Sequence, residues 1–166
     1  MDSLVLGEVS VMEAIIGKSS KQLQELIVIN NERFEGYKTA ADETQDSELK
    51  VLFNSYSLQS KQFSHDLLGL LPEEKYAPKS GEIEISGKLY RFFMDIKTLL
   101  QSKNLAEVLS SCEFEERETK KTYDEVLHNH REIKNEALAV IRKQWIELQK
   151  AHFKIKIIRY KLFFIA

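Results

Sequence analysis

The chain has 166 residues, of which 43% are hydrophobic and 30% are charged, a composition ordinary for a globular protein with one core. Its formal net charge of −2 argues against nucleic acid as a partner, because proteins that bind it usually carry a basic surface. The two prolines and six glycines are few, and this scarcity of helix breakers favours long helices over many short strands.

A single cysteine, Cys112, excludes an internal disulfide and a cysteine-rich zinc site, and it fits a reducing compartment. The first 17 residues do not resemble a signal peptide, because an acid stands at position 2 and glutamates interrupt the apolar run. No apolar run reaches the ~18 residues that a membrane span requires. We therefore expect a cytoplasmic location.

The first predicted helix runs from about Ser20 to Asp42, with Ser19 and Gln22 as a capping box at its start. Residues 1–18 are expected to form an N-terminal extension ahead of a helical bundle over residues 19–160. The helix has one largely apolar face at a spacing of three and four residues. This face consists of Leu23, Leu26, Ile27, Asn30, Phe34, Tyr37 and Ala41.

The second predicted helix starts after Asp46, a good N-cap residue, and ends at Leu71 before Pro72. A polar linker with both prolines follows, and then a shorter helix over about residues 85–102. The inward face of the second helix consists of Leu49, Leu52, Phe53, Tyr56, Gln59, Ser60, Phe63, Leu67 and Leu70.

The third long helix is predicted to start at Asn104, with Glu107 as its capping partner, and to end near His128. The last helix starts near Glu132 and continues toward an apolar C-terminal tail over residues 161–166. Its inward face consists of Ala137, Val140, Ile141, Gln144, Leu148, Ala151, Ile155 and Ile158.

These elements predict an all-α fold. The turns over 42–46 and 128–132 are short, so the helices that they join should form antiparallel hairpins. A long crossover that contains the shorter fifth helix separates the two hairpins. This order is the ferritin-like arrangement of a four-helix bundle.

Each long helix places one polar residue on its inward face near the middle of its length. At 1.5 Å per residue, these four positions lie about 15 to 18 Å from their helix starts. We therefore expect one polar layer at mid-bundle, whichever way the helices run. It consists of Asn30, Gln59, Glu116 and Gln144.

Two interpretations of Glu116 are open. In the first, it is a paired interior carboxylate, with Lys120 one turn later or the amides of Gln59 and Gln144 as donors. In the second, it belongs to an iron or manganese site with Glu113, Gln144 and His152.

A di-iron bundle needs a Glu from each of two helices and a Glu-x-x-His motif from each of the other two, which makes four carboxylates in all. The sequence has one clearly interior carboxylate, and its one literal Glu-x-x-His, Glu125 to His128, falls at a helix end. The inventory for a di-iron site is therefore incomplete.

Catalysis without a metal has little support, because no nucleophile elbow, phosphate-binding glycine loop or dinucleotide fingerprint is present. Cys112 falls on the inward face, where a packed core residue is expected. From Lys150 onward the chain carries bases and no acid, mixed with apolar residues. This C-terminal segment either contacts a membrane or docks on the N-terminal apolar segment or on a second subunit, and we favour docking.

Several segments also resemble a known family: "LQELIVINNERFEGYKTAADET", "DSELKVLFNSYSLQSKQFSHDL", "SGKLYRFFMDIK", "CEFEERETKKTYDEVL" and "QWIELQKAH". Over about residues 20–155 the chain is similar to a bacterial family of ferritin-like four-helix-bundle proteins of unknown function. That family is typified by a Pseudomonas protein and grouped with stress-associated ferritin-like domains. The resemblance implies a ferritin-like fold and metal binding, without an established activity. Some members place Glu where Phe34 and Gln59 stand here, which weakens the metal interpretation.

The sequence thus favours a non-catalytic binding or assembly module, stress-related by resemblance. It would act as a homo-oligomer or with a protein partner through its helix faces. The alternative is an iron- or manganese-binding ferritin-like protein with oxidase or iron-handling activity. DNA protection is disfavoured by the acidic balance of charge.

Overall fold

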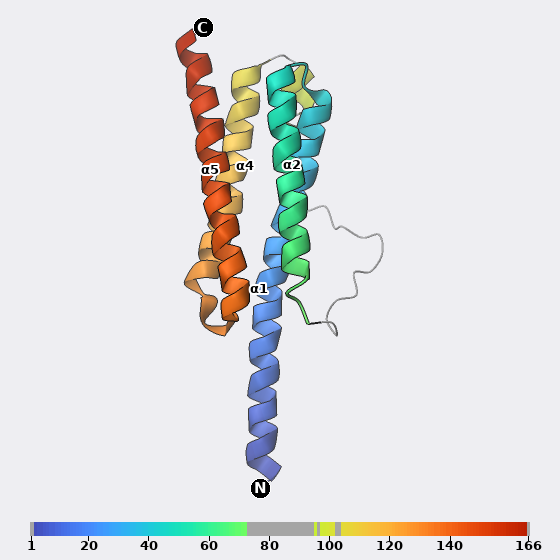
Figure 1. Cartoon of the computed structure of the whole chain (residues 1–166), viewed down its shortest axis with the longest axis vertical. Coiled ribbons are helices and arrows are strands. Elements are labelled where there is room, and N and C mark those ends of the chain that lie inside the picture. The colour runs from blue at the N-terminus through green and yellow to red at the C-terminus, as the bar shows by residue number, and fades with distance from the viewer. Residues whose placement is uncertain (1, 73–94, 96, 102–103, 166) are drawn as a thin grey trace.

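The computed structural model describes residues 2–72, 95, 97–101 and 104–165. Within these residues, four long helices form a bundle: α1 (Asp2–Glu43), α2 (Ser47–Leu68), α4 (Leu105–His128) and α5 (Asn135–Ile165). A short 3-10 turn, η2 (His130–Glu132), lies between α4 and α5 (Figure 1). The described part of the chain contains no strand, so the predicted all-α bundle is confirmed.

The four helices form two antiparallel hairpins, α1 with α2 and α4 with α5, and each hairpin packs along its length (Figure 1). The turn between α1 and α2 is as short as the sequence predicts, whereas the connection between α4 and α5 is longer because it contains η2. The connection between the hairpins runs from the end of α2 to the start of α4. Residues 97–101 of this connection are helical, and the rest of the helix expected over 85–102 falls largely outside the described residues.

Two helix starts follow directly from capping side chains. The Asp46 carboxylate accepts hydrogen bonds from the backbone N–H groups of Glu48 and Leu49, both at 2.9 Å. The Asn104 side chain accepts one from the N–H of Glu107 at 3.3 Å. These bonds satisfy donors that the first turn of a helix leaves without intrahelical partners. Both predicted starts are confirmed within one residue.

The predicted start of the first helix near Ser20 is wrong, because α1 begins at Asp2 and continues without a break. The residues before Ser20 include two glycines but no proline, and glycine weakens a helix without ending it. Gln22 does not act as a capping residue. Its side-chain amide instead donates to the backbone oxygen of Asn129 at 3.1 Å, which ties α1 to the end of α4.

The start of the last helix also differs from the prediction. The chain makes the η2 turn and an extended residue at Ile133 before α5 begins at Asn135. Ile133 is buried, so this extended residue adds an apolar side chain to the core ahead of α5. From Asn135 the helix runs to Ile165, as the sequence pattern indicates.

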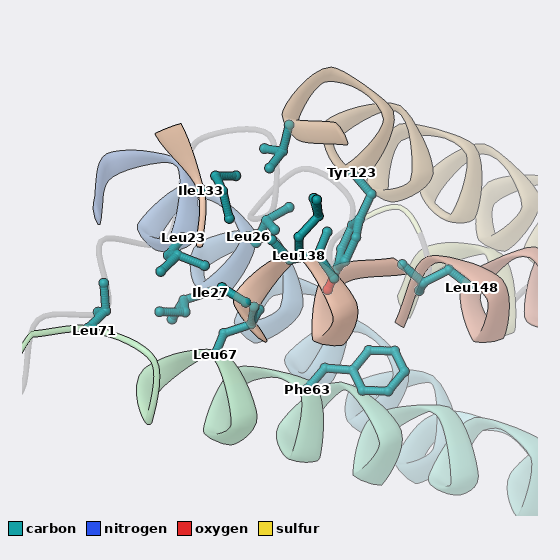
Figure 2. Close-up of a cluster of buried hydrophobic side chains, with 13 residues drawn as sticks. Leu23, Leu26, Ile27, Phe63, Leu67, Leu71, Tyr123, Ile133, Leu138 and Leu148 are labelled. Atoms are coloured by element: carbon teal, nitrogen blue, oxygen red, sulfur yellow. The ribbon is translucent and has the colours of Figure 1, made fainter. Parts of the chain in front are cut away.

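The apolar core has two clusters, one toward each end of the bundle. Figure 2 shows the first, where Leu23, Leu26 and Ile27 of α1 approach Phe63 and Leu67 of α2. On α1, α2 and α4, buried polar residues lie between the residues of the two clusters, so polar groups separate the apolar ends. The second cluster consists of Tyr37, Ala40, Ala41, Leu49, Phe53, Tyr56, Val108, Leu109, Cys112, Ala151 and Ile155.

The length and hydropathy of each helix show whether it could cross a membrane. None of the helices in the described residues combines the length and apolar character needed to cross a bilayer.

The Asp46 cap gives a direct test of the α1–α2 hairpin. Replacing Asp46 with Ala should lower the free energy of unfolding by about 1 kcal/mol, because two backbone donors lose their acceptor. The matched control is Asp46→Asn, which keeps a capping oxygen and should be close to neutral. Urea denaturation measures both variants. Equal losses would show that the charge matters and not the capping hydrogen bonds.

Candidate functional site

The polar interior is built around an ion pair between α1 and α4. Arg33 Nε donates a hydrogen bond to Glu116 Oε1 at 2.8 Å, and Arg33 Nη2 lies 2.8 Å from the same oxygen. The two side chains are 2% and 0% exposed. A buried charge of this kind is tolerated because its partner compensates for the lost hydration.

Other groups complete the surroundings of this ion pair. The Tyr37 hydroxyl donates to Glu116 Oε1 at 2.6 Å, and Arg33 Nη1 donates to Ser60 Oγ at 2.6 Å and to the Tyr56 backbone oxygen at 3.3 Å. The guanidinium carbon lies 5.1 Å and 5.2 Å from the ring centroids of Tyr37 and Tyr56, within the range of cation–π attraction. These contacts connect α1, α2 and α4.

A second set of hydrogen bonds is centred on Tyr123. The Asn30 amide donates to the Tyr123 hydroxyl at 2.6 Å, and that hydroxyl donates to Gln144 Oε1 at 2.7 Å. Gln144 Nε2 in turn donates to the backbone oxygen of Phe63 at 3.2 Å. All four long helices are therefore joined by buried polar contacts. We call the side chains of the two sets the buried network: Asn30, Arg33, Tyr37, Ser60, Glu116, Tyr123 and Gln144.

Burial and charge together set the proton affinities in the buried network. Burial is the largest single influence on Arg33 and lowers its pKa, but Glu116, Tyr37 and Tyr56 together outweigh it, so the pKa is raised. Burial raises the pKa of Tyr37 well above its usual value, and Glu116 raises it further. Burial likewise raises the pKa of Tyr123, and it raises the pKa of Tyr56 to about 12. The tyrosines and the arginine therefore keep their protons at neutral pH.

Cys112 lies in the second apolar cluster, fully buried and free. Burial and the negative charge of Glu116 raise the pKa of its thiol, so the thiol stays protonated at neutral pH. A protonated, enclosed thiol is a poor nucleophile, which agrees with a packing role for this residue.

The structure places the four residues expected at mid-bundle in different surroundings. Asn30 and Gln144 share the Tyr123 hydroxyl, and Glu116 is bound to Arg33 and Tyr37. Gln59 is half-buried, and its side-chain oxygen has no hydrogen-bond partner among the described residues. On α2, the neighbouring Ser60 takes part in the buried network instead.

The expected partners of Glu116 differ from those observed. Lys120 and Gln59 make none of its hydrogen bonds, and Gln144 is engaged by Tyr123 and Phe63. Sequence reasoning missed Arg33, although it lies three residues after Asn30 and four before Tyr37, a spacing that shares their helix face. Phe34 was expected there but is half-buried, with the ammonium groups of Lys38 and Lys61 near its ring.

The other residues expected to bind a metal, Glu113 and His152, lie in surroundings of their own. Glu113 Oε2 lies 2.6 Å from Arg159 Nε, so this carboxylate pairs with α5 through an arginine. His152 is half-buried, and partial burial lowers its pKa. Among the described residues, no group of three or more His, Cys, Asp or Glu side chains is arranged to hold a metal ion.

This geometry defines the class of protein: an all-α bundle whose interior holds an ion pair surrounded by hydrogen-bonded polar side chains. The family described as "Domain of unknown function (DUF2383)" matches residues 18–129, and the chain belongs to this family. No curated protein and no solved structure matched the chain. The matched range contains both Arg33 and Glu116, whereas α5 lies outside it.

The ion pair predicts a strong coupling between its two partners. Arg33→Met should lower the free energy of unfolding by about 3–5 kcal/mol, because it leaves the Glu116 carboxylate buried without its cation. Arg33→Met combined with Glu116→Leu should recover most of that loss, since no uncompensated charge is left. Urea denaturation of the single and double variants measures the coupling.

The exposed Lys150–Glu147 pair provides the matched control for the Arg33 and Glu116 variants. Its members are 67% and 37% exposed, so Lys150→Met should cost at most about 1 kcal/mol. If the double variant lost as much free energy of unfolding as Arg33→Met and Glu116→Leu lose together, the assigned pairing would be contradicted.

The raised tyrosine pKa values predict a loss of stability in alkali. An unfolded tyrosine titrates near pH 10, whereas folded Tyr56 keeps its proton to about pH 12. Over this interval the folded state binds more protons, so the free energy of unfolding should fall as the pH rises. Urea denaturation across the interval measures the slope, and Tyr56→Phe should make it shallower. A free energy independent of pH over this range would contradict the prediction.

Proposed function

We propose that this protein is a non-catalytic binding or assembly module on a ferritin-like bundle. The order of elements supports the ferritin-like arrangement, since a long connection joins two antiparallel hairpins. In this proposal the interior gives the bundle one fixed packing, and the outer helix faces carry the function.

The observation that carries the proposal is the position of the Arg33 guanidinium. Ferritin-like metal centres need interior carboxylates free to neutralise metal cations. Here the Glu116 oxygen already faces a buried cation at 2.8 Å and accepts a further hydrogen bond from Tyr37. The residues present therefore do not fit an iron or manganese site, because the positive charge of Arg33 beside Glu116 would repel a metal cation bound to this carboxylate.

The remaining buried groups support the same conclusion about chemistry. Tyr37, Tyr123 and Cys112 keep their protons at neutral pH, because burial raises their pKa values. Groups held in this state do not act as general bases or nucleophiles near neutrality. The stress-associated role that the resemblance implies would then depend on binding and not on metal oxidation.

The outer faces supply apolar surface that a binding module would use. Phe153, Ile157, Tyr160 and Phe164 on α5 are all exposed, as are Val51 and Leu58 on α2. Apolar side chains that recur on one helix face are typical of surfaces that contact another protein.

The proposal predicts the outcome of metal reconstitution. After anaerobic incubation with Fe(II) or Mn(II) and removal of free metal, the protein should hold no more metal than Glu116→Gln does. The reason is that Arg33 neutralises the only fully buried carboxylate among the described residues. Elemental analysis gives the metal content per chain.

The matched control is Glu125→Gln, an exposed carboxylate on the same helix. Stoichiometric metal in the natural chain and in this control, lost only in Glu116→Gln, would overturn the proposal in favour of a metal-binding protein.

A further inference from the structure

Two helices extend beyond the body of the bundle at opposite ends. The N-terminal part of α1 projects past the turn between α4 and α5, and the C-terminal end of α5 projects past the other helices (Figure 1). We call residues 2–17 of α1 the α1 extension. The bundle begins just after it, where Lys18 pairs with Glu132 of η2 at 3.2 Å and Gln22 binds the Asn129 backbone.

The α1 extension continues the apolar face of α1, and no other helix of the described residues lies against it. Met12 and Ile16 are 61% and 41% exposed, and the same helix face continues to the buried side chains of Ser20, Leu23 and Ile27. The face that packs inside the bundle is therefore repeated outside it, where it is open to solvent. An apolar face of this length on a projecting helix is a typical contact surface.

The outer face of α5 carries a second apolar row, which we call the α5 stripe. Its members are spaced by three, four or seven residues, so they lie on one side of the helix in the pattern of a coiled-coil seam. Each is about half exposed or more. The α5 stripe consists of Ile146, Phe153, Ile157, Tyr160 and Phe164.

Charge distinguishes the two surfaces. Residues 1–17 contain three acids, Asp2, Glu8 and Glu13, and no base. From Lys150 onward the chain contains five bases and no acid. Lys150 pairs with Glu147 and Arg159 with Glu113, so the positive charge of this end rests on Lys154, Lys156 and Lys161. If two α1 extensions or two α5 stripes packed together, charges of the same sign would face each other. If the α1 extension packed on the α5 stripe, charges of opposite sign would face each other. Pairing of unlike charges along a helix seam selects the partner and its orientation.

From this complementarity we infer that the α1 extension of one copy of this chain packs on the α5 stripe of a second copy. At 1.5 Å per residue the helix of the extension is about 23 Å long and the helix segment of the stripe about 27 Å, so the two segments match in length. Because they lie at opposite ends of the bundle, a two-fold axis brings each extension onto the other copy's stripe and closes a dimer. This inference rests on the proposed function and names the partner of those outer faces as the chain itself.

The mass of the full chain in solution tests the inference. Sedimentation equilibrium should give a dimer of the 19.3 kDa chain. Ile16→Glu on the extension and Ile157→Glu on the stripe should each raise the dissociation constant about thirtyfold or more, because each places a charge on an apolar face of the contact. Circular dichroism confirms that the variants keep their helix content.

The matched control is Leu58→Glu, which adds the same charge at an exposed apolar position on α2, 66% exposed and outside both surfaces. This variant should stay dimeric. If Leu58→Glu dissociates the dimer as strongly, or if only one of the other two variants does so, the cross-paired contact is wrong.

Charge reversal distinguishes packing of the α1 extension on the α5 stripe from packing of two extensions or two stripes together. Glu13→Lys and Lys154→Glu should each weaken the dimer a few-fold, and the two changes in one chain should restore it, because the unlike charges are then exchanged. Weaker association in the double variant than in either single variant would overturn the inference.

The remaining outcomes also decide between alternatives. If the natural chain is monomeric at its highest soluble concentration, this inference is wrong but the proposed function is not contradicted. The proposed function would be contradicted only by stoichiometric metal binding. Vesicles of anionic phospholipid provide the last arm of the test. Binding to them that is lost in Ile157→Glu would assign the α5 stripe to a lipid surface and overturn the inference.

Discussion

A guanidinium and a carboxylate enclosed in an apolar bundle are tolerated only while they face each other, and the packing of this protein is constrained by that condition. Arg33 on the first hairpin meets Glu116 on the second at 2.8 Å. Sliding one hairpin along the other by a single helical turn, about 5.4 Å, would leave both charges buried and unpaired. The ion pair therefore opposes any other register of the two hairpins. Tyr37 and Ser60 strengthen this constraint, because they are hydrogen-bonded to the pair from α1 and α2.

The interior and exterior of the bundle use their residues in opposite ways. Inside, the groups that could have bound a metal or moved a proton are engaged with one another, as with Glu116 and Arg33 or Gln144 and Tyr123. Outside, apolar side chains such as Phe153 and Ile157 are exposed to solvent. Interior groups that are already paired favour stability and a single packing, while exposed apolar faces favour association. This division is the physical basis for assigning the function to the helix surfaces.

Parts of the candidate site could be predicted from the sequence and parts could not. Asn30, Glu116 and Gln144 stand out as polar residues on apolar helix faces, and all three are buried. The partner of Glu116 could not be found in this way, because Arg33 lies 83 residues away in the sequence. Spacing along the sequence offers Lys120, one helical turn away, and the amides of Gln59 and Gln144 at the same expected level, but not Arg33. Gln59 was chosen from its place on a helix face, but one residue of rotation brings Ser60 to the interior instead.

From the sequence alone come the four long helices, the caps at Asp46 and Asn104 and the antiparallel hairpins, because these depend on periodicity, capping side chains and turns that act over a few residues. It also showed which face of each helix is buried. The tertiary structure alone decided that Arg33 neutralises Glu116, that Tyr123 joins Asn30 to Gln144, and that α1 continues as one helix from Asp2 past the end of the bundle. The first two depend on residues brought together from different helices, and local spacing does not contain that information; the third depends on two glycines that weaken the helix without ending it.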